Sequence, residues 1–197
     1  MINGNTEIIA HIGFPTHSFK SPMIYNPYFE KAKINAVVVP LGCQAEHYPD
    51  FLKSIFQLSN IRGALITMPH KVTTVALLDE VTPTVRVAGA CNAVKKTADG
   101  RLVGDMFDGA GFVRGVQRKG FHLKGKRVLV VGSGGVGSAI AASLAAEEIA
   151  LIGVFDRHLP SCQSLGDRLT ENYPDIDVLV GSNDPAWFDL VVNATPM

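Results

Sequence analysis

A glycine-rich turn between an apolar run and an alanine-rich segment is the feature that most constrains the fold of this chain. The apolar residues 128–131 lead into Gly132-Ser-Gly134-Gly135-Val-Gly137, and a helical pattern follows. In a strand–turn–helix of this kind Gly132 permits the tight turn, Gly134 lets the backbone approach a pyrophosphate, and Gly137 allows the helix to pack on the strand. Free N–H groups at the helix start then favour an anion. The sequence therefore predicts a dinucleotide-binding unit.

An acid follows at the end of the next apolar run. In dinucleotide-binding folds a carboxylate roughly 20 residues beyond the glycine-rich turn accepts hydrogen bonds from the adenosine ribose. Asp156 lies at about this distance from the turn. A carboxylate there would repel the 2′-phosphate of NADP, whereas Arg157 next to it would attract that phosphate or lie over the adenine. Asp156 thus favours NAD, whereas Arg157 is compatible with NADP. Both cofactors stay open, with NAD slightly favoured.

The rest of the chain alternates between short apolar runs and amphipathic segments. This alternation favours a parallel sheet covered by helices on both faces. The expected strands are 7–13, 36–41, 63–67, 126–131, 151–155, 178–180 and 190–193. The expected helices are 23–33 (entered through a capping Ser21 and Pro22), 45–58, 70–78, 108–119, 138–148 and 161–172. Residues 91–95 and 102–103 are expected to pair as a hairpin around Asp99-Gly100, which would add an antiparallel member.

These patterns predict an α/β protein of two domains. Residues 1–107 would form a mostly parallel substrate-binding domain, and residues 108–197 a doubly wound Rossmann-type domain for NAD or NADP. The sequence stops just as a strand finishes, without a covering helix. We therefore expect it to be a piece of a longer protein, with the second domain truncated.

The composition excludes several other classes of protein. The formal net charge is +0 with no basic stripe, so a nucleic-acid partner is not expected. No apolar run approaches the roughly 20 residues of a membrane helix, and the N-terminus does not resemble a signal peptide. Three widely spaced cysteines and scattered histidines indicate neither a disulfide framework nor a metal site. We expect a cytoplasmic protein, either a monomer or a homodimer.

Polar side chains gather in four segments of the first half, namely residues 17–22, 67–71, 90–93 and 104–109. Each lies at the end of an expected strand or the start of an expected helix. Because ligands of open α/β sheets bind outside the carboxyl ends of the strands, these segments are expected to converge on one cleft. His17 and His70 would flank that cleft and could line it.

Lys71 and Asp108 are candidates for acid–base chemistry. Lys71 lies on the first turn of a helix, where a cation is unfavourable against the helix dipole, and Asp108 opens the helix that enters the second half. Oxidation of an alcohol requires a group that takes the hydroxyl proton, and a lysine whose pKa is adjusted by burial and a carboxylate can do so near neutral pH. From spacing alone, a solvated helix lysine and an N-cap are the stronger explanation of Lys71 and Asp108.

Six short segments together resemble the motifs of the shikimate and quinate dehydrogenase family, in the family's order and over nearly the whole chain. Ser21-Pro22 resembles the end of H-S-x-S-P, Thr67-Met-Pro-His-Lys71 resembles T-x-P-x-K, Gly89-Ala-Cys-Asn92 resembles G-A-x-N, Gly104-Asp-Met-Phe-Asp108-Gly109 resembles G-D-N-T-D-G, Gly132-Ser-Gly-Gly-Val136 resembles G-A-G-G-A, and Asn193-Ala-Thr-Pro196 resembles N-A-T-P.

The resemblance implies a role for each matching residue. The family reduces 3-dehydroshikimate reversibly to shikimate within aromatic amino-acid biosynthesis, so the resemblance implies a small-molecule hydroxy acid as the partner of this chain. Lys71 would be the acid/base and Asp108 its partner. The implied substrate-binding residues are Ser18 and Ser21 for the carboxylate, and Thr67, Asn92 and Asp108 for the hydroxyls. The implied cofactor-binding residues are Gly132, Ser133, Gly134, Gly135, Val136, Asp156, Arg157 and Thr195.

The chain also departs from the family pattern. Two residues, Phe19 and Lys20, separate the serines that the family spaces by one, which offers Lys20 as an alternative partner of the carboxylate. Met106-Phe107 replace Asn-Thr, Ala93 replaces Thr, Asp156 stands where NADP users carry Asn, and His158 stands where they carry Thr. We therefore hypothesise a divergent paralogue. The alternatives are an NAD-dependent quinate or aminoshikimate dehydrogenase and, from another class, a non-catalytic dinucleotide or metabolite sensor.

Overall fold

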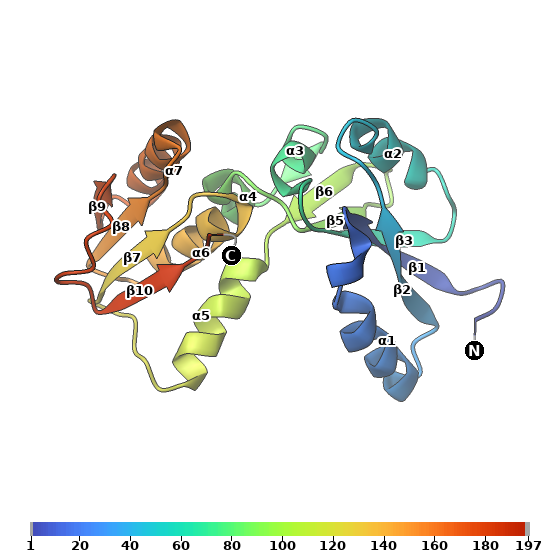
Figure 1. Ribbon diagram of the computed structural model, residues 1–197. Coiled ribbons are helices and arrows are strands. Elements are labelled where there is room, and N and C mark those ends of the chain that lie inside the picture. Colours follow the sequence, from blue (N-terminus) through green and yellow to red (C-terminus); the bar gives the residue numbers. More distant parts are fainter. Residues whose placement is uncertain (1, 196–197) are drawn as a thin grey trace. The chain divides into compact units, whose positions relative to one another are not determined.

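The computed structural model describes residues 2–195 and divides into two compact units, each with its own sheet (Figure 1). The first unit comprises the chain up to Val81 together with Cys91–Asp105, and the second comprises Thr82–Ala90 and the chain from Met106 onward. The segment 82–90 therefore belongs to the second unit, although it lies within the first half of the sequence. No helix among the described residues is long and apolar enough to cross a membrane.

The first unit contains a six-stranded sheet in the order β2-β1-β3-β5-β6-β4. Its strands are β1 (Glu7–Gly13), β2 (Ala36–Gly42), β3 (Ile61–Ile66), β4 (Glu80–Val81), β5 (Ala93–Lys96) and β6 (Leu102–Asp105). β1 runs parallel to both β2 and β3, whereas β5 runs antiparallel to β3 and β6. The predicted hairpin is confirmed, and Lys96 pairs with Leu102 at its closed end.

The helices of this unit are the 3₁₀ turn η1 (Thr16–Ser18), α1 (Ser21–Ala32), α2 (Tyr48–Ile55) and α3 (Lys71–Val75). The prediction of a capping Ser21 is wrong, because Ser21 is the first helical residue and Lys20 occupies the cap without a side-chain bond. Pro22 is tolerated in a first turn, so the helix begins two residues earlier than expected. α2 and α3 are shorter than the predicted 45–58 and 70–78, because turns form at their ends instead of further helix.

One side chain closes part of the outer edge of this sheet. β2 is the edge strand, and the amide of Asn26 in α1 pairs with both backbone groups of Val38. Its Nδ2 donates to the Val38 carbonyl oxygen at 3.1 Å, and its Oδ1 accepts from the Val38 N–H at 2.7 Å. The edge strand also contains Pro40, which has no N–H to offer.

The second unit contains a parallel four-stranded sheet in the order β10-β7-β8-β9. Its strands are β7 (Arg127–Val131), β8 (Leu151–Phe155), β9 (Asp177–Val180) and β10 (Leu190–Asn193), and its helices are α4 (Pro83–Ala88), α5 (Asp108–Arg118), α6 (Gly135–Ala145) and α7 (Leu159–Asn172). The strand order reverses at β7, between β8 on one side and β10 on the other. Such a switch point is where open α/β sheets bind ligands.

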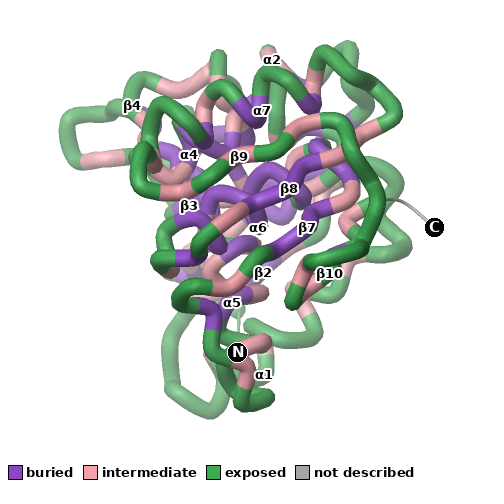
Figure 2. Tube along the Cα trace, turned by 90° about the vertical axis from the view of Figure 1, so that its left-hand side faces the viewer, coloured by how far each residue is buried: buried purple, intermediate pink, exposed green. Residues whose placement is uncertain are grey.

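The core of this unit follows from its apolar sequence. Val128, Leu129 and Val130 of β7 are fully buried, and the alanine-rich helix α6 is buried along most of its length (Figure 2). α6 begins at Gly135, inside the glycine-rich turn, and not at residue 138 as expected. α5 packs on α6 at Gly109, where a side chain would collide with the carbonyl oxygen of Ala139. The short side chains of α6 thus allow it to pack closely on α5 and on β7.

Candidate functional site

The glycine-rich turn in the second unit is shaped by contacts within the protein at two of its glycines. Gly132 adopts φ +108°, which favours glycine, and its N–H donates to the carbonyl oxygen of Phe155 at 2.7 Å. A side chain on Gly132 would meet the carbonyl carbon of Ala194 at 2.9 Å, and one on Gly137 would collide with the carbonyl oxygen of Gly132. Both glycines are therefore required by the packing of the turn itself.

Gly134 has a different explanation. A Cβ at this position would meet no atom within 4 Å, and the backbone of Gly134 has an ordinary extended conformation. Packing within the protein does not account for glycine here, whereas close approach of a phosphate group to the start of α6 does. The turn thus fits the dinucleotide that the sequence predicts.

A cavity of about 510 Å³ lies beside this turn, at the carboxyl ends of β7, β8 and β10. Its size is that of a ligand pocket, for which about 300–1,000 Å³ is typical. The lining residues are Val131, Gly132, Gly134, Phe155, Asp156, Arg157, Ala194 and Thr195. Five of the predicted cofactor residues are among them, while Ser133, Gly135 and Val136 belong to the turn without lining the cavity.

Asp156 is held in place by backbone groups. Its Oδ2 accepts from the Ser133 N–H at 2.6 Å, and its Oδ1 accepts from the His158 N–H at 2.8 Å. These two bonds hold the pKa of the Asp156 carboxyl below its usual value, so the group is ionised at neutral pH. Each oxygen retains a further lone pair with which it can accept a ribose hydroxyl.

Thr195 and Arg157 complete the rim of this cavity. Both the N–H and the hydroxyl of Thr195 bond to Oδ1 of Asn193, at 3.0 and 2.6 Å. The N–H of Ala194 donates to the carbonyl oxygen of Val131 at 2.8 Å, which fixes the end of β10 against β7. Arg157 is exposed. Pro196, the last residue of the predicted N-A-T-P motif, lies outside the described residues.

In the first unit, backbone hydrogen bonds bring Thr67, Asn92 and Lys71 to the carboxyl end of β3. The Thr67 N–H donates to the carbonyl oxygen of Ile12 at 2.9 Å. Asn92 accepts from the N–H of Ile66 at 2.8 Å. The neighbouring Cys91 donates to the carbonyl oxygen of Lys71 at 2.9 Å. Thr67 and Lys71, from one short segment, are thus gathered with Asn92 from a later segment at one end of the sheet.

Lys71 is the first residue of α3 and is half-buried. Asp108 is likewise the first residue of its helix, α5, with Phe107 as the cap. Lys71 belongs to the first unit and Asp108 to the second. Their action as a pair therefore stays a prediction.

The serines of the first unit are placed differently from one another. Ser18 is exposed in η1, and Ser21 is half-buried at the start of α1. Phe19, between them, packs against β1, with its ring 4.2 Å from that of His11 and 2.9 Å from the position of a Cβ on Gly13. A phenyl ring therefore reaches the carboxyl end of β1. The carboxylate-binding roles of Ser18 and Ser21 stay predictions.

Sequence reasoning gave His11 no role, yet it lies close to Lys71. Only 6% of His11 is exposed, and its Nδ1 has no hydrogen-bond partner within residues 2–195. Burial, and then the nearby charge of Lys71, lower the pKa of His11, so the imidazole is neutral. A histidine in an otherwise apolar strand was the signal in the sequence.

His70 and His17, which were expected to flank the cleft, differ in access. His70 is 1% exposed, and its Nε2 lies 2.8 Å from the carbonyl oxygen of Cys43. It is therefore a buried structural group next to Lys71 in the chain and does not line a cleft that a substrate can enter. His17 is exposed in η1. Within the part of the chain that the structure describes, no three His, Cys, Asp or Glu residues are grouped to hold a metal ion.

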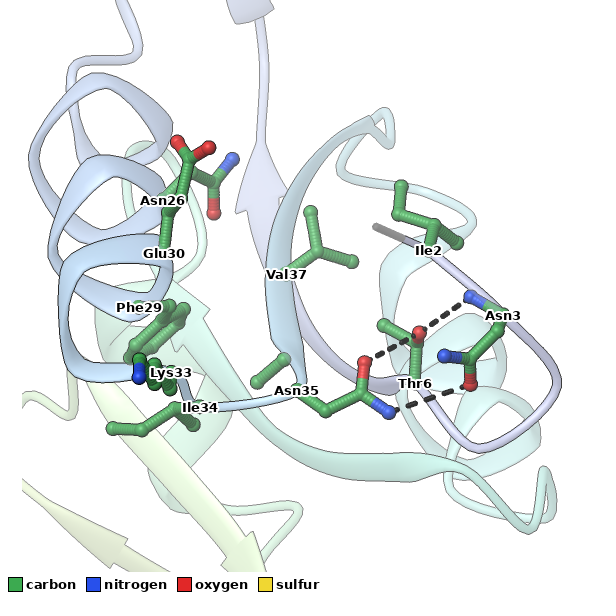
Figure 3. A pocket seen from close by; sticks show the side chains of 11 residues that line it. Ile2, Asn3, Thr6, Asn26, Phe29, Glu30, Lys33, Ile34, Asn35 and Val37 are labelled. Atoms are coloured by element: carbon green, nitrogen blue, oxygen red, sulfur yellow. Dashed lines mark hydrogen bonds between the residues drawn. The ribbon is translucent and has the colours of Figure 1, made fainter.

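A second cavity, about 640 Å³ in volume, lies in the first unit between α1, the segment before β1 and the start of β2 (Figure 3). It is larger than the cavity beside the glycine-rich turn, but it lies at the amino ends of β1 and β2 and is lined by none of the predicted site residues. Its polar groups bond to one another: Thr6 Oγ1 donates to Asn35 Oδ1 at 2.8 Å and accepts from the Asn3 N–H at 2.9 Å. We assign it no ligand.

The glycine-rich turn, the cavity beside it and the ionised Asp156 define a dinucleotide-binding protein of the α/β class. Comparison with known proteins narrows this class. Residues 11–94 match the family model described as the shikimate dehydrogenase substrate binding domain. The chain is 33% identical over 204 residues to the shikimate dehydrogenase (NADP(+)) of Desulforamulus reducens, covering 100% of this chain and 69% of that protein.

Solved structures agree with this comparison. Shikimate 5-dehydrogenase from Listeria monocytogenes, in complex with shikimate and NAD, has a TM-score of 0.88 at 26% identity and covers 98% of this chain and 70% of that one. Quinate dehydrogenase from Corynebacterium glutamicum, in complex with NAD, has a TM-score of 0.83 at 28% identity, covering 98% and 71%. The chain therefore belongs to the shikimate dehydrogenase family. The predicted α/β fold and the class of enzyme, an NAD(P)-dependent oxidoreductase acting on a CH–OH group, are confirmed.

Proposed function

We propose that this protein interconverts 3-dehydroshikimate and shikimate with a nicotinamide dinucleotide, and that Lys71 is its acid/base. The observation that carries the proposal is the gathering of Thr67, Lys71 and Asn92 at the carboxyl end of β3 by backbone hydrogen bonds. The relatives named above support the choice of substrate. The cavity beside Gly134 supports the choice of cofactor.

The chemistry divides between the chain and its cofactor. When bound, the nicotinamide accepts or supplies the hydride. In the direction of oxidation, the neutral amine of Lys71 takes the proton of the reacting hydroxyl while the hydride leaves the same carbon, and in reduction the ammonium returns that proton. Asp108 would stabilise the charged lysine and bind a substrate hydroxyl. Thr67 and Asn92 would hold the ring hydroxyls, with Ser18, Ser21 or Lys20 at the carboxylate.

We further propose that NAD is the preferred dinucleotide. Asp156 is ionised and lines the cavity. A carboxylate beside the adenosine ribose accepts its hydroxyls but repels a 2′-phosphate. The curated relatives are named NADP(+) enzymes, whereas the quinate dehydrogenase structure contains NAD. Asp156 is thus the residue on which this chain's choice would depend.

The second candidate function is an NAD-dependent quinate dehydrogenase, which Asp156 and the neighbouring quinate dehydrogenase structure favour. A non-catalytic sensor on the same scaffold is the alternative from another class. A sensor has no need of Lys71, so Lys71→Ala separates the two classes. In an enzyme this change removes most of kcat while dinucleotide binding persists, and in a sensor the response to the ligand barely changes.

The decisive measurement is the absorbance change of the nicotinamide with the full-length natural protein, using shikimate and quinate, each with NAD and NADP. Turnover of shikimate, lost in Lys71→Ala, is the expected result. Turnover of quinate alone would replace the substrate in this proposal. Absence of turnover with all four pairs would contradict it. The altered segments around Ser18, Ala93 and Met106 would then have moved the protein to another substrate or out of catalysis.

A cytoplasmic location and a monomeric or homodimeric state remain part of this proposal. The three cysteines, Cys43, Cys91 and Cys162, are free and buried, which fits a reducing compartment. Cell fractionation tests the location, and light scattering of the purified protein tests the oligomeric state.

A further inference from the structure

The helix that carries Lys71 is too short to define its own position. α3 spans only the five residues Lys71–Val75, whereas isolated helices below about 12 residues are marginal in water. An acid/base must nevertheless be held within about 0.5 Å of its productive place. The contacts of α3 with the rest of the first unit must therefore supply this precision.

Two stacked rings lie directly before Lys71 in the chain. The rings of His70 and Tyr48 lie with their centroids 3.9 Å apart at an interplanar angle of 5°. His70 Nε2 lies 2.8 Å from the carbonyl oxygen of Cys43, and because a carbonyl only accepts, Nε2 carries the proton. Burial lowers the pKa of His70, so the ring is neutral and keeps this single arrangement.

A chain of hydroxyl groups holds the far side of the same turn. Thr74 Oγ1 donates to the carbonyl oxygen of His70 at 2.8 Å. Its proton is thereby used, so in the 2.6 Å contact between the two hydroxyls Tyr48 must donate to Thr74. Burial raises the pKa of Tyr48, which keeps that donor protonated.

The side chains of Tyr48, His70 and Thr74 are almost completely shielded from water. Tyr48 and Thr74 are 0% exposed and His70 is 1% exposed. Hydrogen bonds without competing water are stronger and more directional than exposed ones. Tyr48 thus contacts this segment twice, through its ring at the cap residue His70 and through its hydroxyl at Thr74 of α3, so that it touches both ends of the turn that contains Lys71.

We propose that Tyr48 is a positioning residue for Lys71, which it fixes through the ring of His70 and the hydroxyl of Thr74. This inference rests on the proposed role of Lys71 as acid/base. Tyr48 touches no reacting atom in this account. Its effect is to restrict the first turn of α3 to one place relative to the sheet.

The test compares Tyr48→Phe, Thr74→Val and the double variant in the full-length natural protein. Tyr48→Phe keeps the stacked ring and removes only the hydroxyl, while Thr74→Val keeps the shape of residue 74. We expect each single variant to lower kcat about tenfold with KM changed less than about twofold, since small displacements of a catalytic group slow chemistry strongly. The double variant should fall no further than Thr74→Val alone, because Thr74→Val already removes the bond from Tyr48 together with the bond from Thr74 to the His70 carbonyl.

Ile55→Val is the matched control. Ile55 is buried at the other end of α2 and is not part of the Tyr48 network. Its substitution should lower stability while keeping the hydrogen bonds and the stacked rings of Tyr48, His70 and Thr74, so Tm should fall while kcat stays at the wild-type value. Additive losses in the double variant, or an equal loss of kcat in Ile55→Val, would overturn the proposal, because either result describes general destabilisation.

Amide hydrogen exchange of residues 71–75 decides the structural part without any assay of activity. The Thr74 N–H donates to the carbonyl oxygen of His70 at 2.9 Å, and its exchange should become about tenfold faster in Tyr48→Phe but not in Ile55→Val. Unchanged exchange would overturn the inference. If Lys71→Ala were fully active, the proposed function would fail by itself, and the exchange rates would still decide whether Tyr48 holds α3.

Discussion

The two units build their candidate sites in different ways. In the second unit the site consists mainly of backbone: a turn shaped by Gly132 and Gly137, the free start of α6, and one carboxylate held by backbone N–H groups. In the first unit it consists of side chains that stand on short segments after the strands, with Lys71 on a helix of five residues. A backbone site requires glycine at fixed spacings, whereas a side-chain site requires only that suitable residues meet in space.

This difference explains how each unit responds to substitution. A backbone site is sensitive to any added side chain, even a methyl group, and tolerates variation in the side chains around it. A side-chain site depends on single functional groups and on the contacts that hold them. The following experiments test this contrast, beginning with the largest expected effect.

Lys71→Ala should reduce kcat by a factor of about 10³, within the 10²–10⁴ range of general acid–base catalysis. Binding of the dinucleotide, measured by titration calorimetry, should change less than about twofold, because that site belongs to the second unit. Lys53→Ala is the control, since Lys53 is an exposed lysine of α2. A comparable loss of kcat in Lys71→Ala and Lys53→Ala would contradict the proposal that Lys71 is the acid/base.

Gly137→Ala and Gly134→Ala should separate packing from ligand binding. The first places a methyl group against the Gly132 carbonyl and should lower the free energy of unfolding by about 1–3 kcal/mol or more. The second meets open space, so Tm should stay near the wild-type value while the dinucleotide Kd rises about tenfold, equivalent to about 1.4 kcal/mol. Equal Tm losses in the two variants, measured by calorimetry, would show that Gly134 also has a packing role.

Asp156→Asn should shift the ratio of kcat/KM for NADP over NAD upward by about tenfold, because the repulsion of the 2′-phosphate is removed. The substitution also tests the pH dependence of stability. The folded-state pKa of Asp156 lies below its usual value, so its stabilisation is present above that value and is lost as pH falls through the folded pKa. The stability difference between wild type and variant should shrink below about pH 4 in denaturant titrations.

His11→Leu should produce the smallest effect, a gain of about 1 kcal/mol in the free energy of unfolding. The substitution removes a buried nitrogen that has no partner among the described residues. Urea titration measures this gain, and His122→Leu is the exposed control. A loss of stability in His11→Leu would mean that the imidazole makes favourable contacts that outweigh its unpaired nitrogen.

The contrast between a site built from local backbone and a site built from side chains that meet in space also explains which features could be predicted from the sequence. The β7–turn–α6 segment and the hairpin of β5 and β6 were predicted because a glycine pattern and an Asp-Gly turn act over a few neighbouring residues. α4 was missed and α3 was predicted too long, since both are short helices whose extent depends on tertiary contacts. The proximity of His11 to Lys71 could not be foreseen, because it depends on the pairing of β1 with β3.

The edge of the first sheet has a chemical consequence. The outward-facing donors of β2 are accounted for at three successive positions: the Ala36 N–H bonds to Ile34, the Val38 N–H bonds to Asn26, and Pro40 has none. A strand from another molecule would find no free N–H at these three positions. The residue after Asn26 is Pro27, whose nitrogen carries no hydrogen. The cyclisation by which asparagine slowly deamidates needs that hydrogen, so Asn26 is expected to keep its amide, and with it both bonds to Val38, as the protein ages.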